Sequence, residues 1–235
     1  QAKAARLCAF QNAVDRGYGC WEVYAEYESP TSSRQKLCVG RIPNPNTVLV
    51  DPDTTKADRS DMKFALKMGK TLSNAAFKKK YPKAKDIAGF SAETIGLAKH
   101  FTDGDTVTPA EYFRIVTKDD TLLTLEDGRD VLKSKLPKGM QVSEGVLFGN
   151  DEMIRVVKSR QTEIPTVEHF VTNGLEILSR ETLPISTIPI IMVLAKEKYV
   201  KDEMTIEAQT SKMREPQLNF DVAVAAKVQA INMVP

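Results

Sequence analysis

Histidines are the residues of this chain best suited to acid–base catalysis or metal binding, and there are only two of them, His100 and His169. Neither stands at ligand spacing from a cysteine or a carboxylate. His169 lies between Val167 and Val171 in a pattern typical of a strand, so we expect a paired or partly exposed structural histidine there. No serine stands in a G-x-S-x-G elbow. The sequence therefore predicts no catalytic, cofactor-binding or metal-binding residue.

The three cysteines, Cys8, Cys20 and Cys38, make neither a disulfide framework nor a CxxC pair. None stands in a recognisable nucleophile context. We expect reduced, half-buried cysteines that pack as small hydrophobic side chains in a cytosolic product.

An acidic run could suggest a calcium loop; it consists of Asp51, Asp53, Asp58 and Asp61. An EF-hand loop starting at its first residue would need an oxygen ligand, a glycine and a glutamate at its fifth, sixth and twelfth positions. Those positions hold Thr55, Lys56 and Met62. We therefore expect these carboxylates to cap turns rather than to bind a metal.

Phosphate-binding patterns are also incomplete. The segment Gly17-Tyr18-Gly19 follows a helical pattern and lacks the third glycine of a dinucleotide fingerprint, and no GxxxxGK[ST] motif occurs. Residues 78–85 carry five lysines in eight positions. They suggest either a phosphate-contacting patch or a solvated helix end favoured by the helix dipole, and we favour the second interpretation.

Composition and charge are those of an ordinary globular protein. Of 235 residues 42% are hydrophobic and 27% are charged, and 33 basic and 31 acidic side chains give a net charge of +2. This balance does not indicate a strongly basic nucleic-acid binder. The longest apolar run, 188–195, is too short to span a membrane, which needs about 20 residues. The chain starts without methionine and stops just after a helical pattern, so we expect a piece of a longer protein.

The first third of the chain has clear periodicity. We expect a helix over 1–16 with an apolar stripe of Leu7, Phe10 and Val14, ended by Gly17. The period then changes to two, which predicts strands over 20–27 and 36–42, and further strands over 47–50 and 63–68. A helix over 73–80 should follow, stopped by Tyr81-Pro82.

The rest of the chain predicts mainly strands. We expect a short helix near 92–100, strands over 107–118 and 121–125 joined as a hairpin at Asp119-Asp120, and loop or short helix over 127–149. Residues 151–160 fit a helix or a strand. Strands over 166–172 and 175–178 should flank a hairpin turn at Asn173-Gly174, and 188–195 should be a buried strand. Residues 205–231 read as helix apart from Pro216, with an apolar stripe of Phe220, Val224, Val228 and Ile231. The predicted fold class is α+β.

Eight segments of the chain form a recognisable series: Asp15 to Val23, Glu26 to Glu28, Val50 to Asp53, Asp58 to Lys63, Phe77 to Pro82, Ala110 to Ile115, Ile188 to Val193 and Arg214 to Asn219. They resemble segments of the portal proteins of short-tailed bacteriophages, in the order in which that family has them. Methionine replaces the family's usual alanine at Met62, Ala195 replaces a glycine, and Leu218 replaces an arginine.

The resemblance implies a portal fold fragment. It divides the chain into a β-rich wing with flanking helices at 1–149, a stem helix at 150–161, a small α/β clip at 162–203 and a second stem helix at 204–235. It also implies a structural subunit of a ring, a dodecamer, at one vertex of the virion. The ring would assemble in the host cytoplasm and pass double-stranded DNA during packaging and ejection.

The implied partners are other copies of the chain, the terminase large subunit, the tail adaptor protein, the capsid and the scaffolding protein. No membrane and no cofactor is implied. Contact with DNA would be non-specific, because a channel must not grip a moving duplex. The candidate channel contacts are Lys201, Lys212, Arg214 and Lys227. An alternative is a nucleic-acid-binding phage or host enzyme that uses the basic run 78–85.

Overall fold

The computed structural model describes residues 1–56, 58–85, 99–102, 105–136, 141–143, 146–149, 152–201 and 203–232. Helices and strands are mixed along the chain, in agreement with the expected α+β class. The helix expected near 92–100 lies almost entirely outside the described residues.

The N-terminal helix α1 (Ala2–Arg16) forms where the pattern predicts it and ends at Gly17. Gly17 has a φ of 97°, a left-handed conformation that suits glycine, and its N–H donates to the carbonyl oxygen of Ala13. The predicted C-cap is thus confirmed.

The face that α1 buries is its alanine face and not the predicted apolar stripe. Strand β1 runs directly beneath it, and a Cβ added at Gly19 would lie 1.9 Å from the carbonyl oxygen of Ala9. Only small side chains fit at this distance, so the large apolar residues turn outward. The buried residues are Ala5, Ala9 and Ala13, and the exposed ones are Leu7, Phe10 and Val14.

A three-stranded antiparallel sheet has the order β13-β1-β2. Its strands are β1 (Tyr18–Tyr27), β2 (Gln35–Arg41) and β13 (Ile190–Leu194). β1 lies in the middle, and Trp21 faces Ile191 across the pair with β13. The predicted strands are confirmed, but the pairing of β1 with β13 brings together distant parts of the sequence.

A larger sheet contains the remaining long strands, in the order β3-β4-β7-β11-β10-β9, with β12 beside β11 and β8 beside β7. Its long members are β7 (Ala110–Leu125) and β11 (Glu152–Thr172), which pair along most of their length. The shorter members are β3 (Val48–Val50), β4 (Phe64–Met68), β8 (Asp130–Leu132), β9 (Gln141–Ser143), β10 (Val146–Gly149) and β12 (Ile177–Leu183).

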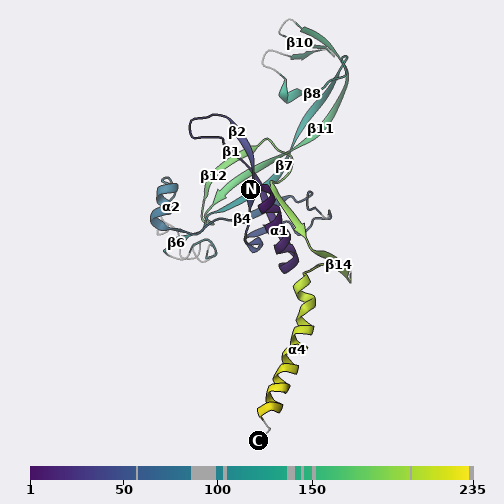
Figure 1. Ribbon diagram of the computed structural model, residues 1–235. Coiled ribbons are helices and arrows are strands. Elements are labelled where there is room, and N and C mark those ends of the chain that lie inside the picture. The colour runs from purple at the N-terminus through teal and green to yellow at the C-terminus, as the bar shows by residue number, and fades with distance from the viewer. Residues whose placement is uncertain are drawn as a thin grey trace.

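β7 and β11 leave the body of the molecule as a ribbon that carries β8, β9 and β10 at its far end (Figure 1). We call this projection the arm. It corrects two expectations. The hairpin expected at Asp119-Asp120 does not form, because β7 continues through both residues opposite Thr162 and Glu163 of β11. The range 127–149, expected as loop or short helix, contains three strands.

The prediction of a helix over 150–161 is wrong, because residues 152–161 belong to strand β11. β10 pairs with β11 on one side from Glu152 to Arg155, and β7 pairs with it from Val156 onward. The local pattern of residues 151–160 fits a helix or a strand, and the pairing of this segment with β10 and β7 makes it a strand. The boundary expected at 162, between stem and clip, therefore falls inside one continuous strand.

One core joins residues from the ranges expected as wing and clip. Val167 and Ile190 are 0% and 2% exposed, and both lie in this core. The strand predicted as buried, 188–195, thus packs against the N-terminal half instead of forming the core of a separate unit. The cluster consists of Cys20, Ile42, Val48, Met62, Ala65, Phe113, Val167, Ile188, Ile190 and Met192.

Short elements complete the chain. Helix α2 (Asn74–Lys80) is capped by the Ser73 hydroxyl, which accepts from the N–H of Ala76. The hairpin β14 (Lys196–Val200) and β15 (Glu203–Glu207) leads into helix α4 (Gln209–Asn232), which points away from the body and contains Pro216 (Figure 1). The other elements are β5 (Leu72–Ser73), β6 (Thr106–Val107) and the 3-10 turns Pro45–Thr47 and Lys133–Lys135.

The turn at 173–176 is longer than the two-residue hairpin predicted. Gly174 has the expected positive φ, 80°. Asn173 is 1% exposed, and its side-chain oxygen accepts from the N–H groups of Leu175 and Glu176. The turn thus uses asparagine as a buried cap.

The three cysteines are free, with Cys8 half-buried and the other two buried. Burial raises the pKa of the Cys20 thiol to about 12, which keeps it protonated and unreactive. Within the described part of the chain, no helix is both long and apolar enough to cross a membrane.

Candidate functional surfaces

Helix α4 is exposed along its whole described length, including its apolar residues. Successive residues of a helix are about 100° apart, so two apolar stripes result. One contains Met213, Phe220, Val224, Val228 and Ile231, which extends the stripe predicted from the sequence, and the other contains Leu218 and Val222 on the opposite side. We call these the major and minor stripes of α4.

The base of α4 is held to the body by a few contacts. The Thr210 hydroxyl donates to the carbonyl oxygen of Asp15 at the end of α1. Glu207 accepts from Lys198 Nζ at 2.7 Å and lies 3.4 Å from Lys212 Nζ. The hydrogen bond from Lys198, with the charges of both lysines, lowers the pKa of Glu207. The helix is therefore anchored at its first turn and projects beyond it.

The four candidate DNA contacts do not form one patch on this chain. Lys201 has a φ of 52° at the turn between β14 and β15, whereas the others lie on α4. Lys212 and Arg214 are two residues apart and thus about 200° apart around the helix axis. Lys227 lies about 22 Å further along the axis than Lys212.

The lysine run 78–85 starts in the last turn of α2, which matches the interpretation as a helix end. The ammonium of Lys80 lies 5.4 Å from the centre of the Tyr81 ring. The backbone N–H of Lys85 donates to Glu176 Oε1 at 2.7 Å. The run therefore borders a cavity of about 330 Å³ whose opposite wall is the start of β12.

The acidic run 51–61 caps turns, as predicted. Asp51 is 3% exposed and accepts from the N–H groups of Asp53 and Lys63. Asp61 accepts from the N–H and the hydroxyl of Thr55, both at 2.8 Å. The N–H of Thr55 is the main cause that lowers the pKa of Asp61 to about 2.

A buried arginine in this loop was missed by the sequence analysis. Arg59 is 5% exposed and adopts a φ of 54°. One terminal nitrogen donates to the carbonyl and hydroxyl oxygens of Thr54, and the other lies 3.4 Å from the sulfur of Met204 in β15. Arg59 thus connects the loop to the hairpin that precedes α4.

A polar cluster lies on the larger sheet where it faces β1. His169 Nδ1 is 2.7 Å from Glu181 Oε1, and its ring stacks on Phe113 at 4.5 Å between centroids. His169 is thus paired, which is one of the two arrangements expected. Its Nε2 is buried without a hydrogen bond and lies 3.8 Å from Glu111 Oε2. Sequence reasoning could not find these partners, because the strand register alone brings them together.

Lys67 completes the cluster and links the two sheets. Its ammonium contacts Glu22 of β1 and lies 3.0 Å from Glu111 Oε2. Burial alone would lower the pKa of Lys67, but the hydrogen bond with Glu22 and the charge of Glu111 outweigh it, so the pKa is raised. Lys67 therefore carries a full positive charge between two carboxylates.

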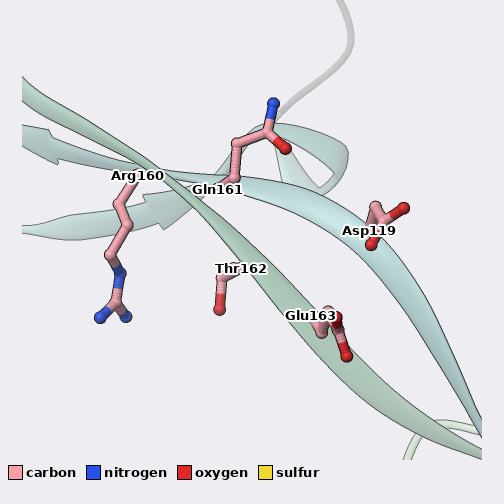
Figure 2. A pocket seen from close by; sticks show the side chains of 5 residues that line it. All are labelled: Asp119, Arg160, Gln161, Thr162 and Glu163. Carbon is pink, nitrogen blue, oxygen red and sulfur yellow. The ribbon is translucent and has the colours of Figure 1, made fainter.

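The arm has a polar hollow of about 440 Å³ where only β7 and β11 are paired. Figure 2 shows side chains from both strands around it, with Arg160, Thr162 and Glu163 on β11 and Asp119 on β7. Asp119 is one of the two residues at which the sequence suggested a turn. Within the described residues, no group of three or more histidine, cysteine or acidic side chains could hold a metal ion.

The whole chain matches a known protein family. The model of the family described as Phage P22-like portal protein matches residues 1–235. No curated protein sequence matches the chain. The match agrees with the resemblance seen in the ordered segments between residues 15 and 219 and extends it to both ends. The chain therefore belongs to the P22-like phage portal protein family.

Proposed function

We propose that the chain is one subunit of a twelve-membered portal ring through which double-stranded DNA is packaged and later ejected. Family membership supports the structural role. The main support for a ring is the exposure of α4, a 24-residue helix with no buried side chain among those described. We assign α4 to the second stem helix, within 204–235, and the N-terminal range 1–149 to the wing.

The two stripes of α4 fit a ring geometry. A subunit of a cyclic ring contacts two neighbours through two different surfaces. A helix with apolar side chains on opposite sides can meet one neighbour with each side, whereas a helix in a two-fold dimer needs only one such surface. Isolated helices are marginal in water without tertiary packing, so packing against neighbours would also stabilise α4.

DNA contact in this ring is weak and electrostatic. The candidate residues Lys201, Lys212, Arg214 and Lys227 are offset by five acidic residues, so the segment 201–235 has a net charge of −1. Their spread around and along α4 provides scattered phosphate contacts and no base readout. Binding should therefore fall steeply with added salt and show no sequence preference.

The partners of the ring are the terminase large subunit, the tail adaptor protein, the capsid and the scaffolding protein. The docking range for terminase and adaptor is 162–203. Within the described residues β12 pairs only with β11, so its other edge is open to a partner strand. The assembled ring belongs to the virion at the portal vertex and forms in the host cytoplasm.

The test is the mass of the longest expressible form, measured by native mass spectrometry and negative-stain imaging. The parent should form closed rings. The double variant Phe220→Ser/Val224→Ser, in the major stripe, should be monomeric and still folded. The matched control Gln217→Ser/Asn219→Ser changes exposed polar residues of the same helix and should still form rings.

Two outcomes contradict the proposal in different ways. Rings formed by the double variant would exclude the major stripe as the contact. A parent that stays monomeric and turns over DNA or ATP would favour the alternative enzyme, for which the described residues give no support. The expected result with DNA, ATP and magnesium is no turnover.

A further inference from the structure

A cavity of about 530 Å³ lies between the two sheets, and its lining combines residues of the range 162–203 with residues of β1, β2 and β7. One wall is formed by β1 and β2, and the other by β7, β11 and β12. The segment between β12 and β13 contributes Pro184, Ile185 and Pro189 to the lining. Residues of both sheets are thus within reach of one ligand.

The charged groups of this cavity are unbalanced. Its lining includes the carboxylates of Glu22, Glu111 and Glu181. Lys67, the cation of the adjacent cluster, already contacts the first two. Glu181 has 61% of its side chain exposed, and its partner among the described residues is the imidazole of His169. Three carboxylates therefore share one lysine, and the cavity is acidic.

Apolar side chains make up much of the rest of the lining. Leu183, Pro184 and Ile185 stand beside Glu181, and Leu37 lies on the opposite wall with 81% of its surface exposed. An apolar wall next to a carboxylate suits a side chain with an aliphatic stem and a cationic end, which is the chemistry of lysine and arginine.

The cavity also opens onto an unpaired strand edge. Pairing of β1 with β13 ends at Glu22, and one more bond joins the N–H of Val23 to the carbonyl oxygen of Pro189. Alternate residues of a strand point their backbone groups to the same edge. The N–H groups of Ala25 and Tyr27 therefore point to this edge, and the described residues provide no backbone partner for either.

We propose that this edge and cavity form a docking site for an extended, basic segment of a partner protein. The segment adds a strand to β1 at Tyr24–Tyr27, in line with β13, and its main chain bonds to Ala25 and Tyr27. One lysine or arginine side chain of the segment enters the cavity and pairs with Glu181. Main-chain bonds provide attachment, and the carboxylates select a basic side chain.

The test uses the capped peptide Thr-Val-Lys-Val-Thr, with binding followed by calorimetry and by amide shifts. The peptide should bind and shift the amides of Ala25 and Tyr27. Glu181→Gln should weaken binding about tenfold, since it removes a charge-assisted bond. Glu163→Gln makes the same charge change on the arm and should have no effect.

A second variant tests the strand edge independently. Ala25→Pro removes an N–H that the pairing with β2 does not use, so β1 and β2 should remain paired while peptide binding is lost. The proposal is overturned if Thr-Val-Glu-Val-Thr binds as well as the lysine peptide, or if n-butylamine binds as tightly, which would indicate a small-amine site. It is also overturned if Ala25→Pro abolishes self-association while no peptide binds, because the occupant is then a second copy of the chain.

Discussion

The core shared by the two sheets and the projecting helix α4 use their apolar residues in opposite ways. In the core, residues from β1, β7, β11 and β13 cover one another, and Val167 and Ile190 are almost inaccessible to water. In α4, Phe220 and Val222 are 64% and 62% exposed. The chain thus has one region whose apolar residues cover one another and one whose apolar residues, in the proposed ring, would be covered by other subunits. Substitutions in the two regions should accordingly affect different measurements.

The largest effect should come from a charge in the core. Ile190→Asp places a carboxylate at a site that is 2% exposed, where a buried unpaired charge is very costly. We expect a loss of at least about 4 kcal/mol in the free energy of unfolding, enough to unfold a marginally stable domain. Urea denaturation followed by circular dichroism measures it. Ile177→Asp, at a site 62% exposed on β12, should cost less than about 1 kcal/mol.

A methyl group between α1 and β1 should have the next largest effect. Gly19→Ala would place its Cβ 1.9 Å from the carbonyl oxygen of Ala9, so the helix must move off the strand. We expect destabilisation by about 3 kcal/mol. Gly128→Ala meets no atom within 4 Å and has a φ of 82°, so it should cost only about 1 kcal/mol of backbone strain. Equal losses for the two variants would contradict the close packing of α1.

Acid should weaken the body through Asp61. Its pKa is lowered from 3.8 to about 2 in the folded chain, so its carboxylate stabilises the fold above pH 3.8 and loses that effect as the pH falls toward 2. Asp61→Asn should therefore flatten the loss of stability in this window, measured as unfolding midpoints against pH. Thr55→Ala removes the hydroxyl donor and keeps the N–H, so its curve should lie between the two. Identical curves for all three chains would exclude this role.

The smallest effect on stability should come from removing most of α4. A chain ending at Glu215 keeps Thr210 and Lys212, which anchor the helix, and loses exposed residues. We expect the free energy of unfolding of the remaining chain to change by less than about 0.5 kcal/mol, while ring formation is lost. A large drop in the unfolding midpoint would mean that α4 packs against its own body in solution.

The sequence predicts the locally determined elements well. Helix α1 has its glycine cap, α2 has its serine cap, and β1 alternates so clearly that its bounds lie within two residues of those expected. In these segments the same local signals that favour an element also end it. The exposed stripe on α1 is an exception, since periodicity gives the spacing of the apolar residues and not which face meets the sheet.

The errors lie where distant partners decide the structure. Asp119 and Asp120 are residue types that favour a turn. On the arm, however, both lie in a two-stranded ribbon open to water, where a polar side chain in a strand costs little free energy. β11 supplies the pairing that extends β7 through them. The same pairing makes residues 152–161 a strand. The sequence also did not predict the polar cluster around His169, because Glu111 and Glu181 come close to His169 through strand register and not through spacing in the sequence.

The central position of β1 has a consequence for synthesis of the protein. Trp21 emerges from the ribosome about 170 residues before its partner Ile191. Translation proceeds at about 5–20 residues per second, so one edge of β1 stays unpaired for on the order of ten seconds or more. During this time the apolar core residues that β13 buries remain exposed. Folding of the body should therefore wait until β13 has been synthesised and should be slow, as expected for contacts distant in sequence. During this interval the nascent chain should bind general chaperones, so the supply of assembly-ready subunits depends on the folding capacity of the cell.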